Sequence, residues 1–138
     1  MPFTLGTEGQ PDYYAYELAL AARKVVTEVT PVQPGQQVVI TADTASDPRV
    51  VQATAQATFA VGGMPTVIWY PTLSQPCMDP PGPVANALLK ADLWIEFATA
   101  YQLYSPAYEA AIAAGCPYLC LTGMDVDMMV RTIGRVNY

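Results

Sequence analysis

The stretch Gln33–Tyr70 constrains the fold of this chain more than any other part of the sequence. It reads QPGQQVVITADTASDPRVVQATAQATFAVGGMPTVIWY. The run Val38–Ile40 is too short for a helix and is β-branched, which is typical of a buried strand. Asp47 followed by proline starts a helix, because the carboxylate accepts from free N–H groups of the first turn and proline needs no donor there. The glycines at 62 and 63 end that helix, residues 67–70 form a second strand, and the order predicts a parallel β-α-β unit.

The rest of the chain continues this alternation of helices and strands. Apolar residues at helical spacing predict a lead helix over residues 12–30. Further helices are expected over residues 83–91, over 106–114 and from 125 onward, and further strands over 93–98 and 118–122. Residues 71–83 contain five prolines and form a stiff loop, which either shapes the wall of a pocket or a subunit contact, or only connects its neighbours. The pattern predicts one α/β domain over residues 1–138, a small doubly wound, Rossmann-like parallel sheet of about four strands with helices on both faces.

The chain has fewer charged residues than the surface of a free-standing domain of this kind normally carries. Apolar residues make up 52% of the chain and charged residues only 13%, so we expect a second domain or a partner subunit to cover part of the surface, and a homo-oligomer to form. The net charge of -6 includes no basic cluster, which argues against binding to nucleic acid or to an anionic membrane. The N-terminal residues lack the pattern of a secretory signal, and three cysteines form no disulfide framework, so a cytoplasmic location is expected.

Several kinds of catalytic site are excluded because the chain contains no histidine. A Ser-His-Asp or Cys-His arrangement is impossible, and so is a metal site built on imidazole. Cys116 and Cys120 can be read as two ligands on a strand, but without a second pair they are better explained as small core residues. The loop after the first strand lacks the glycines of a dinucleotide or nucleoside triphosphate site. We therefore assign no catalytic residue, no metal ligand and no cofactor to this chain.

Ligands of doubly wound sheets bind beyond the carboxyl ends of the strands. The loops expected there carry the carboxylates of Asp43, Asp47 and Asp125, of which the last two also serve as helix caps. Glu96 is unusual inside a strand, since a buried carboxylate is costly unless it is paired. It lies either on an edge or partly wet face, which we favour, or in a catalytic position. The loop after the third strand, residues 99–105, is rich in aromatic residues.

Two segments of the chain resemble a known group of enzymes. SDPRVVQATAQATFAVGG and ALLKADLWIEFATAYQLYSPAYEAAIAAGCPYLCLTGMDVDMMVR are similar to the N-terminal domain of the aminopeptidase T superfamily, which includes metal-dependent leucyl aminopeptidases and iron-dependent 2,5-dihydroxypyridine 5,6-dioxygenases. The opening QPGQQVVI resembles the aminopeptidases, whereas Ser46–Arg49 and Tyr104–Pro106 resemble the dioxygenases. Members are much longer and hold their metal on a C-terminal domain that has no counterpart here.

The resemblance implies that this chain is the N-terminal domain of a longer metal-dependent enzyme, with iron or zinc on the missing C-terminal domain. It implies that the loop after the third strand caps a small-molecule substrate, and the candidate contacts are Tyr101, Leu103, Tyr104 and Ser105. The tyrosines would stack on a flat ring, or would instead plug the domain interface. Asp43, Asp47 and Arg49 are candidates for contacts to that interface or around the site. The hypotheses that remain open are a hydrolase or ring-cleaving dioxygenase, and a non-catalytic binding or assembly module.

Overall fold

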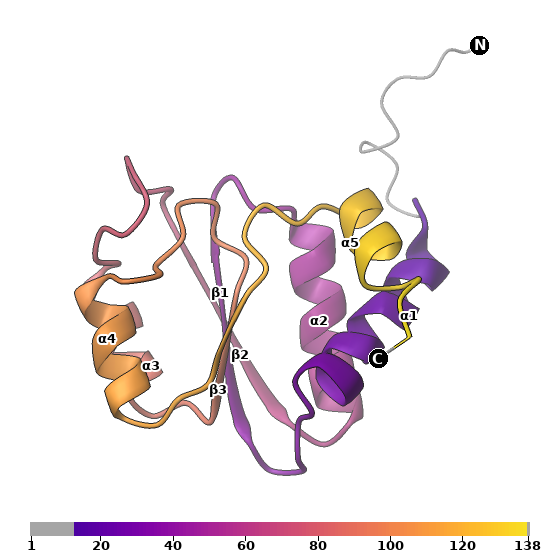
Figure 1. The fold of residues 1–138 in the computed structure, drawn as a ribbon, viewed down its shortest axis with the longest axis horizontal. Coiled ribbons are helices and arrows are strands. Elements are labelled where there is room, and N and C mark those ends of the chain that lie inside the picture. Colours follow the sequence, from indigo (N-terminus) through magenta and orange to yellow (C-terminus); the bar gives the residue numbers. More distant parts are fainter. Residues whose placement is uncertain (1–12, 138) are drawn as a thin grey trace.

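Four parallel strands form the sheet at the centre of the molecule, in the order β2-β1-β3-β4 (Figure 1). The structure is a computed structural model that describes residues 13–137. Each strand pairs in parallel with its neighbour. The strands are β1 (Gln37–Asp43), β2 (Met64–Tyr70), β3 (Leu93–Glu96) and β4 (Tyr118–Cys120). The doubly wound, Rossmann-like sheet predicted from the sequence is confirmed.

Helices cover both faces of this sheet (Figure 1). One face carries α1 (Ala15–Lys24), the π-helical turn η2 (Val25–Val29), α2 (Pro48–Ala60) and α5 (Val126–Thr132). The other face carries α3 (Gly82–Leu88) and α4 (Pro106–Ala113). The chain moves from β1 to β2 in one direction and then returns past β1 to β3 and β4. The order therefore reverses between β1 and β3, and the carboxyl ends of these two strands mark the point where this fold usually binds ligands.

Two hydrophobic clusters lie on the two faces of the sheet. Along β3 and the residues directly after it, successive side chains belong alternately to one cluster and the other. Ile95 and Phe97 pack under α1, α2 and α5, whereas Trp94 and Ala98 pack under α3 and α4. This alternation is the one that the sequence predicts, because successive side chains of a strand point to opposite faces. No helix within residues 13–137 is long and apolar enough to span a membrane.

The predicted helix starts are confirmed at three places. Asp47, Ser105 and Asp125 each accept a hydrogen bond from a backbone N–H of the first turn of α2, α4 and α5. Pro48 and Pro106 occupy the first helical positions, where a missing N–H costs nothing. These caps place the N-termini of α2, α4 and α5 at the carboxyl edge of the sheet.

The predicted helix over residues 12–30 is too long. The α-helix begins at Ala15, and from Val25 to Val29 the chain forms a π-helical turn in which Thr30 donates its backbone N–H to Val25 O at 2.8 Å. The segment VVTEV contains three β-branched valines and a threonine, which fit an α-helix less well than the alanines before them. Residue 12 lies outside the described part of the chain.

Two predicted environments are wrong. Glu96 lies on neither an edge nor a wet face: it is 0% exposed, because β3 is an inner strand between β1 and β4. Cys120 is exposed rather than part of the core, since β4 ends there at the outer edge of the sheet, whereas Cys116 is buried as expected. The sequence does not give the strand order, and the strand order decides both outcomes.

Candidate functional site

Four loops meet at the carboxyl edge of the sheet, along the upper side of Figure 1. They follow β1, β2, β3 and β4, and hydrogen bonds join each to another. Ser46 Oγ donates to Phe97 O at 3.0 Å, which links the loops after β1 and β3. The Thr44 and Thr72 hydroxyls lie 2.9 Å apart between the loops after β1 and β2. Thr122 Oγ1 donates to Ala98 O at 2.8 Å and so joins the loop after β4 to the same edge.

Asp43 occupies the point where the strand order reverses. Its side chain is 0% exposed. Oδ2 accepts from the backbone N–H and hydroxyl of Thr99 at 2.7 and 2.9 Å and from the Ala100 N–H at 3.2 Å. Oδ1 accepts from the Ala45 N–H at 3.0 Å and lies 3.2 Å from Ser46 Oγ, whose single proton is donated to Phe97 O. Burial raises the pKa of Asp43, but these hydrogen bonds outweigh it and hold the pKa below its usual value.

The Asp43 carboxylate therefore takes the role that an anionic ligand would play at this position in a doubly wound sheet. Backbone N–H groups of the loop after β3 converge on it, as they would on a phosphate. Because the chain's own anion satisfies these donors, the geometry does not favour a phosphate or nucleotide at the switch point. Asp43 instead fastens the loop after β3 to the end of β1.

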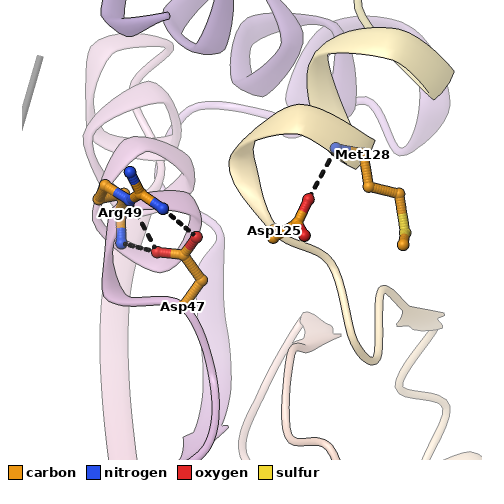
Figure 2. A network of polar contacts seen from close by, with 4 residues as sticks. All are labelled: Asp47, Arg49, Asp125 and Met128. Carbon is orange, nitrogen blue, oxygen red and sulfur yellow. Dashed lines mark hydrogen bonds and ion pairs between the residues drawn. The ribbon is translucent and has the colours of Figure 1, made fainter. Parts of the chain in front are cut away.

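Asp47 and Arg49 lie at the start of α2, next to the start of α5 (Figure 2). Asp47 Oδ1 accepts from the Arg49 backbone N–H at 2.9 Å and from Arg49 Nε at 3.1 Å, and Oδ2 accepts from Nη2 at 3.0 Å. Burial raises the pKa of Asp47, but Arg49 and the Val126 N–H more than offset this, so the pKa lies below its usual value. Asp125 caps α5 by accepting from the Met128 N–H at 2.7 Å. The ion pair thus lies within the start of α2, and the Val126 N–H links Asp47 to the start of α5.

A second buried carboxylate, Glu96, lies under the loop after β3. Its Oε1 accepts from the Gln102 backbone N–H at 3.0 Å and from the Tyr118 hydroxyl. Within residues 13–137, Glu96 Oε2 has no hydrogen-bond partner at normal distance and angle. The same is true of both polar atoms of the Gln102 side-chain amide. The Gln102 amide lies near the Tyr70 hydroxyl, and this contact opposes the rise in the pKa of Tyr70. We call Tyr70, Glu96, Gln102 and Tyr118 the Glu96 cluster.

Burial dominates the titration of this cluster. It raises the pKa of Glu96 to about 7, the hydrogen bonds from Tyr118 and Gln102 oppose this rise, and the nearby charge of Asp43 adds to it. Burial and the Glu96 charge raise the pKa values of Tyr70 and Tyr118. Tyr118 therefore donates to Glu96 as a neutral phenol. The cluster holds Gln102 and with it the centre of the candidate capping loop.

The loop over residues 99–105 presents two of its predicted contact residues to solvent. Tyr104 is 71% exposed and Tyr101 is 37% exposed, whereas Leu103 is half-buried. Tyr104 adopts a left-handed conformation with φ of 67°, which is strained for a residue other than glycine. Its ring meets Tyr108 edge-on at 5.9 Å. Tyr104 thus points outward at the edge of α4.

Ser105 is placed differently from these tyrosines. It is 0% exposed, and its Oγ accepts the Tyr108 N–H at 3.1 Å, so its hydroxyl is used as a helix cap. The proline-rich loop supports the same region, because Cys77 donates its N–H to Tyr101 O at 2.8 Å and Asp79 Oδ1 accepts the Ala107 N–H at 2.9 Å. The aromatic loop is therefore held from below by Glu96 and from the side by the loop after β2.

The described residues do not form a metal site. Within residues 13–137, no group of three or more Cys, Asp or Glu side chains is arranged to hold an ion, and the chain has no histidine. Among residues 13–137, the carboxylates of Asp43 and Glu96 are fully buried, and both accept hydrogen bonds from the loop after β3. The donor set present here does not fit iron or zinc.

No protein-family model and no curated protein sequence matches this chain. Similar folds occur among solved structures. They include 2,5-dihydroxypyridine dioxygenase from Pseudomonas putida KT2440, with a TM-score of 0.73 and 21% identity, and wild-type AmpT from Thermus thermophilus, with a TM-score of 0.55 and 15% identity. The matches cover 86% and 87% of this chain but only 37% and 42% of those chains. At these identities the likeness shows a related fold, and this chain spans less than half the length of either protein.

Proposed function

We propose that this chain is the substrate-capping and oligomerisation domain of a longer, cytoplasmic, metal-dependent enzyme, an aminopeptidase-like hydrolase or a ring-cleaving dioxygenase that acts on a small aromatic substrate. The observation that carries the proposal is the pair of exposed tyrosines, Tyr101 and Tyr104, on a loop fixed at the carboxyl edge of the sheet. The fold similarity supports it, because one of the two longer proteins is a dioxygenase of 2,5-dihydroxypyridine, a flat ring.

The loop is suited to closing a pocket because little of it needs to be ordered when a ligand binds. Gln102, between the two tyrosines, is held by Glu96, and the Tyr101 carbonyl is held by Cys77. A loop that is ordered before binding spends less conformational entropy on the complex. Tyrosine rings supply flat apolar area and a hydroxyl that can donate to a polar ring substituent.

The other predicted residues take supporting parts in this proposal. Leu103 contributes apolar area between the tyrosines, and buried Ser105 fixes the start of α4 below them. Asp43 holds the loop to β1. Asp47 and Arg49 lie where a second domain that covers the carboxyl edge would contact α2.

We propose that any metal of such an enzyme is held by residues other than 13–137, since the donor set of these residues does not fit one. The proposed partner is therefore a C-terminal domain or another subunit that carries iron or zinc and activates water or dioxygen. The part assigned to this chain is to orient the substrate and exclude solvent.

A non-catalytic binding or assembly module is the second candidate. It is favoured by the inward orientation of Asp43 and Glu96, which are both completely buried and paired within the domain. Such a module would bind a partner through the carboxyl edge without contributing to a reaction.

Substitutions in the natural full-length protein test the capping role. Tyr104→Ala and Tyr101→Phe are assayed with 2,5-dihydroxypyridine and with leucine p-nitroanilide, and Phe59→Ala, an exposed aromatic residue of α2, serves as the control. We expect Tyr104→Ala to raise KM about 5- to 12-fold for one of the two probes, since a lost stacking contact is worth roughly 1–1.5 kcal/mol. If both tyrosine variants match Phe59→Ala on both probes, the capping role is wrong.

A further inference from the structure

The outer face of α1 leaves large side chains in solvent. Tyr16 is 91% exposed and Leu20 is 52% exposed, and Arg23 continues the same line along the helix. Their spacing of four and three residues puts them on one stripe of an α-helix. The opposite stripe, with Leu18, packs into the core. We call Tyr16, Leu20 and Arg23 the α1 ridge.

Hollows flank the ridge on both sides. A groove of about 550 Å³ lies between α1 and α2, and small side chains line much of it, including Ala15, Ala19, Ala53 and Ala57. A smaller hollow of about 200 Å³ lies between α1 and the α5 end, beside Leu20. Small residues let a second helix approach closely. A ridge next to a groove on one surface is self-complementary, which is the requirement for a two-fold contact between identical chains.

The charges on α1 favour an antiparallel arrangement of two copies. Glu17 lies in the first turn, and Arg23 and Lys24 lie in the last turn. Two antiparallel α1 helices place Glu17 of each copy opposite the basic end of the other, whereas a parallel pair would bring like charges together. Lys24 Nζ already donates to Gly134 O and Val136 O at 2.9 and 2.8 Å. Of the two basic residues in the last turn of α1, we therefore assign Arg23 to the contact.

We propose that a second copy of this chain docks antiparallel on α1, with the ridge of each copy in the groove between α1 and α2 of the other. This inference rests on the oligomerisation part of the proposed function and is independent of the capping loop. The contact lies on the outer surface of α1 and α2, which cover one face of the sheet. The loop over residues 99–105 therefore stays open to its ligand. Burial of Tyr16 and Leu20 would remove two of the exposed apolar side chains of a chain with few surface charges.

Sedimentation velocity over a concentration series of the 138-residue protein tests this. Leu20→Glu puts a carboxylate at the middle of the ridge, and Ile112→Glu is the matched control on α4, across the sheet, where the side chain is 41% exposed. Circular dichroism checks that both variants are folded. We expect the wild type and Ile112→Glu to form dimers, and Leu20→Glu to raise the dimer dissociation constant about tenfold or more through repulsion and lost packing.

A charge reversal tests the orientation. Glu17→Arg alone should weaken the dimer, and Glu17→Arg combined with Arg23→Glu should restore it, because the opposite pairs are re-formed across the two-fold axis.

The outcomes that contradict the proposal differ in what they overturn. A wild type that stays monomeric throughout the series overturns both this interface and the oligomerisation part of the proposed function. A dimer that Leu20→Glu leaves intact, or that Ile112→Glu weakens equally, overturns this interface alone. If the wild type is monomeric and a variant lacking residues 1–12 dimerises, the occupant of the groove is that segment and not a second copy.

Discussion

Glu96→Gln should stabilise this protein, by an amount that grows as the pH rises from 4.5 to about 7 and then stays constant. Glutamine keeps an oxygen that can accept from the Gln102 N–H and the Tyr118 hydroxyl, the two partners of Glu96 Oε1. It replaces Oε2, which makes no hydrogen bond within residues 13–137, with a neutral NH₂ group. The substitution therefore removes the buried charge and retains the shape of the Glu96 cluster.

The magnitude follows from the pKa of Glu96, which burial raises from 4.5 to about 7. The folded protein binds a proton at this carboxyl that the unfolded chain releases between these pH values. Stability contributed by the protonated form is complete below the unfolded pKa and is lost as the pH rises through about 7. The difference corresponds to a loss of about 3 kcal/mol, an upper value because Gln102 can turn towards the ionised carboxylate.

Urea unfolding at a series of pH values from about 5 to about 9 measures this loss. The fluorescence of Trp94 is a suitable signal, since its ring is buried and lies 4.4 Å from that of Tyr118. We expect the free energy of unfolding of the wild type to fall by up to about 3 kcal/mol relative to Glu96→Gln across this range. Glu28→Gln, at an exposed position, should follow the wild type. Parallel pH profiles for the wild type and Glu96→Gln would refute the reasoning.

Three further predictions concern the loops and thiols around the site. Cys77 and Cys120 should react with Ellman's reagent in the folded protein, and Cys116 only after unfolding, because burial and then the Asp92 charge raise the pKa of its thiol to about 11; simultaneous reaction of all three would contradict this. Ser105→Ala should lower the free energy of unfolding by about 1 kcal/mol through loss of the α4 cap. The control Ser74→Ala, at an exposed position, should change it by less than about 0.5 kcal/mol. Equal effects of the two substitutions would count against Ser105 as the N-cap of α4. At the left-handed Tyr104, valine should be less stable than asparagine by about 1–2 kcal/mol in the same unfolding assay, and equal stabilities would indicate that the loop is not held in this conformation.

Local signals in the sequence predict much of the fold. Asp47-Pro48 and Ser105-Pro106 mark helix starts because the capping carboxylate or hydroxyl and the proline act on adjacent residues of the chain. The glycines at 62 and 115 have φ of 96° and 89°, which other residues rarely adopt, so they mark helix ends equally well. The π-helical turn after Lys24 has no comparable signal. The extent of the first helix is therefore misjudged.

The candidate site is less predictable because its key contacts join residues far apart in the sequence. Glu96 attracts attention as a carboxylate within an apolar strand, but its environment depends on β4 lying beside β3, which supplies Tyr118. Gln102 is a polar loop residue by sequence and is completely buried in the structure. Asp43 is predicted at the carboxyl edge, yet its role as an internal anion depends on the path of the loop after β3. An acidic residue within a predicted strand of apolar residues is the one signal that could have led to the Glu96 cluster.

The central claim is that this chain works as one domain of a longer metal-dependent enzyme. The intact mass of the natural protein, purified from its source and measured together with its metal content, tests this claim most directly. We expect a chain more than twice as long as these 138 residues, in line with the 37% and 42% of the similar proteins that the match covers, with iron or zinc bound. A natural product of 138 residues that contains no metal would contradict the claim and leave the assembly module as the better explanation.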